Sequence, residues 1–278
     1  MISPLSNAEA KYTLFADDTT ISVKADTLHQ ATHLLHEVET VAKHWFAANK
    51  LVLNEEKTER IVFSLRDCGA INGELTNIRF LGVTIDPTLK WNVHIDNIST
   101  RLTKAIYLLR SLSNCVSQTV LKTSYHAVFH SIMTYGILVW GHSTHVSRLF
   151  NLQRKAIRAM AGLGFREDCR KAFKNYNILT LPSHYIFANL MYIKEHEQLY
   201  KVHGEVHSYD TRQRNMLTTT YHRLKRCQDG PGYLSAKLFN ALPIEIRNLE
   251  YSKFKSAVKT FLTINCFYSL DEYFNYKF

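Results

Sequence analysis

The sequence has little of what would place a protein in a membrane, in a secretory pathway or in a repeat fold. No apolar run approaches the roughly 20 residues that a membrane-spanning helix needs. Residues 1–10 have neither the positive charge nor the apolar stretch of a signal peptide. Internal repeats and low-complexity tracts are absent. We therefore expect an intracellular protein, cytoplasmic or nuclear, that is soluble and makes no membrane contact.

Cysteine is scarce, and its spacing excludes the usual cysteine-based sites. The five cysteines stand at positions 68, 115, 169, 227 and 266, so no two are close enough in sequence to form a metal knuckle or a redox motif. Their odd number fits reduced thiols inside a cell. No motif for a small-molecule cofactor is evident either.

What the sequence does have is an ordinary globular composition with an uneven charge. Apolar residues make up 46% of the 278, which is enough for a core in one large domain or two modest ones. Residues 1–86 carry 8 Lys+Arg and 12 Asp+Glu, net −4, whereas residues 87–278 carry 26 and 12, net +14. Basic surfaces bind polyanions by releasing counterions, with little dependence on sequence. Nucleic acid is thus the expected partner of the basic part, although basicity also serves solubility alone.

Residues 12–23 alternate as two short, half-buried strands joined by a tight acidic turn. Asp17 and Asp18 are expected to lie side by side in this turn. Two adjacent carboxylates repel each other unless they share a cation, and Mg²⁺ is a hard ion that takes oxygen ligands. The pair predicts either a Mg²⁺ site, with Mn²⁺ as the alternative ion, or an ordinary solvated turn.

The pattern after the hairpin predicts one long helix and two further strands. Apolar residues recur every three or four positions from Thr27 onward, and Asn49 is expected to end this helix. Strands are expected at residues 60–65 and 78–85. Asp86-Pro87 then breaks the sheet and marks a domain boundary.

Helical periodicity dominates the rest of the chain. Three helices are expected: the first starts near Trp91, the second covers residues 116–133 and the third covers residues 145–161. The third helix leaves three cations outside its apolar stripe, namely Arg154, Lys155 and Arg158. Cations on one exposed side of a helix suit a phosphate backbone, and they also suit a plain solvated face.

Residues 203–232 have no regular period and are expected to form an exposed loop. Its basic residues are Arg212, Arg214, Arg223, Lys225 and Arg226. They stand among aromatic residues, a mixture that suits unpaired bases. A last helix follows at residues 253–264, and the aromatic tail after it is expected to fold back on the helices because it is too apolar for water.

Several motifs together resemble a known family. Phe15-Ala16-Asp17-Asp18 between two strands resembles the aromatic-x-Asp-Asp box of reverse transcriptases. The remaining elements follow in the order found in non-LTR (LINE-type, jockey-like) retrotransposon reverse transcriptases. The first is Trp45 before Asn49-Lys50-Leu51, followed by Asn54 and Lys57-Thr58. The second is Phe80-Leu81-Gly82-Val83, which is similar to the primer-grip hairpin. The third comprises Tyr135-Gly136, Trp140-Gly141 and residues 152–158, which are similar to the C-terminal half of jockey-type elements.

The resemblance implies an α+β fold with three parts. Residues 1–86 would be a partial palm, a small antiparallel sheet remnant with one packed helix. Residues 87–178 would be a mainly α-helical thumb, and residues 179–278 a helical C-terminal region that includes the basic loop 203–232.

The resemblance also implies RNA-directed DNA polymerase activity. The implied binding partners are RNA or an RNA–DNA hybrid, and primer DNA. Asp17 and Asp18 would be catalytic metal ligands, and Lys57 would lie near the active site, where its charge can neutralise the developing pyrophosphate. Nucleic acid would contact the primer-grip residues Phe80, Leu81 and Gly82.

Polymerases of this kind use two metal ions, and a further essential carboxylate comes from a strand before the Asp-Asp hairpin. Residues 1–11 are too few to supply that strand. We therefore expect the C-terminal portion of a reverse transcriptase that lacks catalysis on its own. The alternatives are a non-catalytic remnant that still binds RNA or RNA–DNA hybrid, and a scaffold protein retained without either activity.

Overall fold

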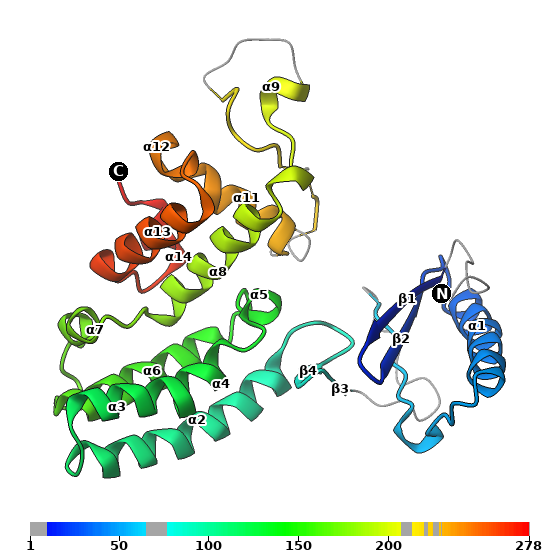
Figure 1. The fold of residues 1–278 in the computed structure, drawn as a ribbon, viewed down its shortest axis with the longest axis horizontal. Helices are drawn as coiled ribbons and strands as arrows, with labels where there is room; N and C mark the ends of the chain where they lie inside the picture. Colours follow the sequence, from blue (N-terminus) through cyan, green and yellow to red (C-terminus); the bar gives the residue numbers. More distant parts are fainter. Residues whose placement is uncertain are drawn as a thin grey trace. The chain divides into compact units, whose positions relative to one another are not determined.

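The computed structural model describes residues 10–64, 77–206, 213–219, 222–224, 228 and 230–277. The chain forms two compact units, Met1–Arg60 and Ile61–Phe278 (Figure 1). The first unit contains one small antiparallel sheet, a long helix and a short 3-10 helix, and the second contains another small sheet and the other helices. The α+β class predicted from the sequence is confirmed. The β3–β4 hairpin, which we expected to close the palm, falls in the second unit.

The first unit is a hairpin packed against one long helix. Strands β1 (Ala10–Phe15) and β2 (Asp18–Val23) pair antiparallel from Ala10 opposite Val23 to Phe15 opposite Asp18. Helix α1 spans Leu28–Ala48, and its buried side consists of Leu34, Val38 and Ala42. The short helix η2 (Glu55–Lys57) follows.

Helix α1 begins and ends where the sequence indicates. Thr27 accepts a hydrogen bond from the Gln30 amide, and the Gln30 side chain accepts one from the Thr27 amide. This reciprocal capping box satisfies amides that a helix start otherwise leaves unpaired. Asn49 caps the other end, as predicted.

The predicted second pair of strands is wrong in detail. Residues 60–64 do not form a strand; instead the Arg60 guanidinium binds the Glu39 carboxylate at 2.6 Å. The segment expected to be one strand at 78–85 is itself a hairpin, with β3 (Ile78–Phe80) paired to β4 (Val83–Ile85). The chain reverses in the middle because Leu81 and Gly82 both have positive φ, at 45° and 81°.

In the second unit, the three predicted helices follow the β3–β4 hairpin. The first two elements are α2 (Asn92–Ser113) and α3 (Gln118–Tyr125); α3 continues through the π-helical turn η3 (His126–His130) into α4 (Ser131–Thr134). A short helix α5 (Ile137–Trp140) and the long α6 (Val146–Ala161) complete the group. Helix α2 packs most extensively on α6 (Figure 1). The second helix therefore covers the predicted span but contains a π-turn that the periodicity did not indicate.

Helix α8 (Leu181–Glu195) is the centre of the C-terminal part. It packs against α11, α13, α14, α5 and α6, and eight of its side chains are buried. The other elements are α7 (Arg170–Tyr176), η4 (Glu197–Leu199), α9 (His203–Val206), α11 (Pro231–Asn240), α12 (Ile244–Arg247), α13 (Tyr251–Asn265) and α14 (Leu270–Phe274).

The aromatic tail folds back on these helices, as predicted. Tyr273 of α14 is fully buried, and its hydroxyl donates a hydrogen bond to the Leu238 carbonyl at 3.0 Å. Within the described ranges, none of the helices combines the length and the apolar character needed to span a bilayer.

Candidate nucleic-acid and metal site

The Asp-Asp pair lies at the exposed tip of the β1–β2 hairpin. Ala16 and Asp17 form a two-residue turn, in which Ala16 has a φ of 53°. Asp18 is already the first residue of β2 and pairs with Phe15. The expectation that both carboxylates sit in the turn is corrected: Asp17 occupies the turn and Asp18 begins the strand, because the left-handed Ala16 closes the hairpin after two residues.

Both Asp side chains are exposed. Two carboxylates on consecutive exposed residues suit a hard divalent cation, which takes one or two protein carboxylates and completes its shell with water or phosphate. Among the residues the structure describes, no three His, Cys, Asp or Glu side chains are grouped to hold a metal ion. The pair can therefore contribute two oxygen ligands, and further ligands would come from solvent or substrate.

The apolar side chains of the hairpin are only partly covered. The partial palm implied by the resemblance would leave Tyr12, Leu14 and Val23 without their cover and therefore exposed; Leu14 is 54% exposed, and Phe15 beside the acidic turn is 61% exposed. Tyr12 and Val23 are half-buried instead, and burial raises the pKa of the Tyr12 phenol. The prediction is confirmed for Leu14 and wrong in degree for the other two, whose side chains lie on the half-buried positions of the hairpin.

Lys57 lies in the same unit as the Asp pair. It ends the short helix η2, and its amide donates to the Asn54 side chain at 3.3 Å, so Asn54 fixes the loop. Lys43 of α1 holds this loop through Glu55 at 2.9 Å. The Lys57 side chain is exposed, a location compatible with a role in binding phosphates.

The Phe80-Leu81-Gly82 turn is held by the later Tyr135-Gly136 motif. The Tyr135 hydroxyl donates a hydrogen bond to the Leu81 carbonyl at 2.7 Å. A Cβ added at Gly82 would lie 3.4 Å from the Tyr135 ring, and one at Gly136 would lie 3.3 Å from Val83. Two motifs that are 54 residues apart thus form one structural group, in which both glycines have the positive φ that other residues rarely adopt.

Sequence reasoning missed the residues that anchor this hairpin to the helices. The Thr84 amide donates to Nδ1 of the buried His94 at 3.2 Å, and the His94 ring packs 5.7 Å from the Trp140 ring. Trp140 in turn donates from Nε1 to the Tyr135 carbonyl at 2.9 Å. Burial, followed by Arg101, lowers the pKa of His94. No motif marked His94; its spacing of three from Trp91 on the start of a helix was the available signal.

Asp86 was interpreted as part of a sheet break, and the structure gives it a second role. Its carboxylate accepts hydrogen bonds from the amides of Thr88, Lys90 and Trp91, the last at 2.7 Å. Burial raises the pKa of Asp86, but these hydrogen bonds and the Thr88 hydroxyl outweigh it and leave the pKa below its usual value. Asp86 therefore organises the turn that leads into α2.

The three cations of α6 have different surroundings. The Arg154 guanidinium lies 5.5 Å from the centre of the Tyr268 ring and 6.0 Å from that of Phe150. The Nε of Arg158 donates to the Glu167 carbonyl at 2.7 Å. Lys155 is exposed, whereas Arg154 and Arg158 are half-buried. The three residues lie on one helix as expected, but two of them also make contacts within the protein.

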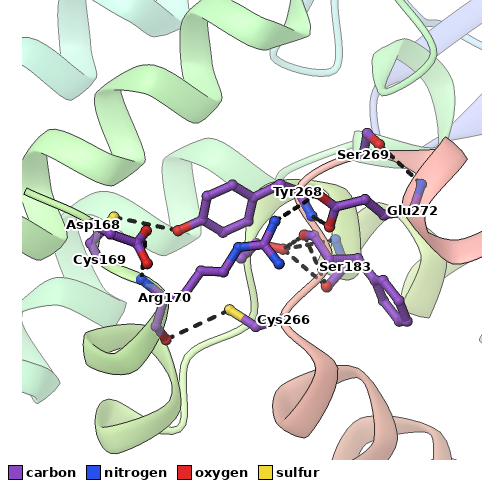
Figure 2. Close-up of polar contacts among 10 residues, drawn as sticks. Asp168, Cys169, Arg170, Ser183, Cys266, Tyr268, Ser269 and Glu272 are labelled. Carbon is purple, nitrogen blue, oxygen red and sulfur yellow. Dashed lines mark hydrogen bonds and ion pairs between the residues drawn. The ribbon is translucent and has the colours of Figure 1, made fainter. Parts of the chain in front are cut away.

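A polar cluster around Tyr268 joins α7 to α14 (Figure 2). The Arg170 guanidinium lies 4.1 Å from the centre of the Tyr268 ring and 2.6 Å from the Glu272 carboxylate. The Tyr268 hydroxyl and the Cys169 thiol are 3.6 Å apart, and the Cys266 thiol donates to the Arg170 carbonyl at 3.9 Å. Burial raises the pKa of Cys266 to about 11, so this thiol is protonated and unreactive at neutral pH.

The predicted basic loop is only partly described. Arg212, Lys225 and Arg226 lie outside the described residues. Arg214 and Arg223 are exposed, and the Arg214 carbonyl accepts a hydrogen bond from the Gly204 amide at 3.0 Å. The described residues 213–219 are held in place, because the Asn240 side chain accepts from the Leu217 amide and donates to the Leu217 carbonyl, both at 2.9 Å.

Comparisons with known proteins find relatives over about half of the chain. The chain is 27% identical over 175 residues to the RNA-directed DNA polymerase from mobile element jockey of Drosophila funebris, which covers 58% of this chain and 19% of that protein. The jockey polymerase of Drosophila melanogaster is 26% identical over 162 residues, 53% of this chain and 18% of that protein. A probable RNA-directed DNA polymerase from transposon BS of the same species is 26% identical over 161 residues, 52% and 18%.

No protein-family model matches the chain, and no solved structure matches it. Over about half of its length the chain is similar to RNA-directed DNA polymerases of mobile elements. Within that class it is similar to those of the non-LTR elements jockey, BS and X-element, so the resemblance expected from the motifs is confirmed. The matched region spans about a fifth of the length of these relatives.

Proposed function

We propose that the chain is the C-terminal portion of a non-LTR retrotransposon RNA-directed DNA polymerase. The match to the jockey, BS and X-element polymerases carries this proposal. It is supported by the order of the elements: an Asp-Asp hairpin, a long helix with its loop, a tight β-hairpin and then helices. In this proposal residues 1–86 are the end of the palm, 87–178 the thumb and 179–278 the C-terminal region.

The proposed metal ligands are Asp17 and Asp18, with Mg²⁺ as the ion and Mn²⁺ as the alternative. When bound, such an ion stabilises negative charge on a phosphate during nucleotidyl transfer. The protein's own contribution is to hold both carboxylates at a two-residue turn that paired strands fix on either side. Lys57 would add a positive charge near the phosphates. Nucleic acid would contact Phe80, Leu81 and Gly82.

The chain alone is proposed not to extend a primer. A two-metal site needs carboxylates from more than one strand, and the relatives that carry the polymerase name are about five times as long as the matched region. The partner proposed for the chain by itself is RNA or an RNA–DNA hybrid, bound without turnover.

Primer extension on poly(rA) with an oligo(dT) primer and Mg²⁺ tests the absence of catalysis. We expect synthesis by the full chain to equal the background measured for Asp17→Ala. The matched control is Asp26→Ala, since Asp26 is an exposed aspartate of the same unit. Template-dependent synthesis that Asp17→Ala abolishes and Asp26→Ala preserves would overturn this part of the proposal.

The second candidate function, a retained scaffold, would need no nucleic acid. The net charge of +14 on residues 87–278 favours nucleic-acid binding over it. The salt dependence of RNA binding, described in the Discussion, separates the two.

A further inference from the structure

The π-turn η3 keeps two sets of side chains aligned along one helix. Leu121, Tyr125, Phe129 and Met133 recur at every fourth position and are all fully buried. An α-helix has about 3.6 residues per turn, so a strict four-residue spacing would drift around it, and a wider π-turn corrects the drift. The residues that directly follow Leu121, Tyr125 and Phe129 in the sequence are aligned in the same way. Lys122, His126 and His130 therefore form a second row beside the buried side chains.

The row of Lys122, His126 and His130 lies against a third histidine, His184, from helix α8. The His126 and His130 rings have centres 5.1 Å apart, and the His130 ring lies 4.9 Å from that of His184 on α8. His126 is exposed, and the other two are half-buried. In the described part of the chain, no protein group hydrogen-bonds to the ring nitrogens of these three residues. Half-buried polar atoms of this kind are normally satisfied by water or by a bound molecule.

The surroundings of the three rings are positive. Lys259 of α13 lies within electrostatic range of all three, and Lys122 acts on His126. Among the residues that the structure describes, no carboxylate is one of the charged groups that act on them. Burial, followed by these neighbours, lowers the pKa of His130 to about 3 and that of His184 to about 4. At neutral pH each of these two rings is therefore neutral and keeps one N–H donor.

We propose that Lys122, His126, His130, His184 and Lys259 form a site for a backbone phosphate of single-stranded nucleic acid. The two ammonium groups supply charge, and the imidazole N–H groups supply donors to phosphate oxygens. The two lysines disfavour a metal cation at the same place, because like charges repel. The choice of a nucleic-acid strand rests on the proposed function; the phosphate chemistry rests on this cluster.

The first measurement follows the three rings directly. Ring proton resonances of the full chain are recorded by NMR while oligo(U) is added in the presence of a chelator, and fluorescence anisotropy of labelled oligo(U) reports total binding. We expect the resonances of His126, His130 and His184 to shift with the same affinity that anisotropy gives. Phosphate binding should also raise the pKa of His126, because an anion favours the charged ring.

The second measurement uses matched charge variants. Lys122→Gln with Lys259→Gln removes both positive charges from the proposed site for one phosphate, so the slope of log affinity against log salt should become shallower by roughly 0.7. The control pair is Lys171→Gln with Lys253→Gln, two exposed lysines elsewhere in the same unit. This control should leave the slope near that of the unmodified chain. Thermal melts establish that both pairs fold.

Each contrary outcome has a distinct meaning. If oligo(U) binds but the ring resonances of the three histidines do not shift, the site is wrong and the proposed function stands. The same conclusion follows if both lysine pairs change the salt slope equally. If inorganic phosphate shifts the rings but oligo(U) does not bind, the nucleic-acid assignment and the proposed RNA binding both fail. A requirement for added Zn²⁺ would replace the phosphate site with a metal site.

Discussion

At the scale of single residues, the family-like motifs have structural causes that can be separated from chemistry. Trp140-Gly141 resembles a retrotransposon motif, yet its side chains pack inside the second unit. Trp140 is fully buried and bonds the Tyr135 carbonyl. Gly141 lies so close to the Tyr185 ring that an added Cβ would overlap a ring carbon, which leaves no room for a side chain. The motif therefore stabilises the fold.

Gly141→Ala should destabilise the second unit strongly. The added Cβ would lie 2.5 Å from the Ile137 carbonyl oxygen and against the buried Tyr185 ring, and backbone cannot move aside cheaply. Overpacking of this kind costs about 1–3 kcal/mol, which chemical denaturation measures as a loss of unfolding free energy. Gly232→Ala is the control, because nothing lies within 4 Å of its added Cβ. Equal stability of the two variants would contradict the packing argument.

At the scale of elements, local signals predicted the end of α1, while turns inside elements needed the structure. The Asn49 end of α1 was predicted from the sequence, and the structure identifies Thr27 as the cap at its start. Alternation alone did not predict the reversal at Leu81-Gly82, because the apolar residues on either side fit a single strand; only the resemblance to the primer-grip hairpin pointed to a turn there. The π-turn at His126–His130 was also not predicted, because a single four-residue apolar step is ordinary in a helix and only the drift over the three steps from Leu121 to Met133 distinguishes it.

Thr27→Ala should weaken the start of α1. The variant loses the Thr27 hydroxyl, which accepts from the Gln30 amide and donates to the Gln30 side chain, at a cost of about 1 kcal/mol, and the first turn should exchange its amide hydrogens faster. Thr27→Ser keeps the hydroxyl and should restore both stability and protection. Identical exchange in the alanine and serine variants would show that the capping box contributes nothing measurable.

At the scale of the whole molecule, the uneven charge predicts salt-sensitive RNA binding. The affinity of the full chain for single-stranded RNA should fall steeply with salt, with a slope of roughly −0.7 per phosphate contact and little base preference. Neutralising Arg154, Lys155 and Arg158 together should flatten this slope. Because Arg154 and Arg158 also contact Tyr268 and Glu167, a thermal melt must accompany the triple variant.

Two results would count against this prediction. An unchanged affinity and slope in the stable triple variant would mean that this side of α6 is merely solvated. Failure of the full chain to bind RNA even at low salt would favour the scaffold alternative.

The sequence by itself determined the α+β class, the acidic hairpin, the long capped helix and the family resemblance. These features depend on neighbours within a few residues, where periodicity, caps and turn residues act directly. Tertiary structure alone decided that Tyr135 would hold the Leu81 turn, that Arg154 would pack on Tyr268, and that three histidines would meet beside Lys259. Each of these contacts joins residues far apart in the chain, and such pairings are set by how the helices pack, which no local pattern encodes.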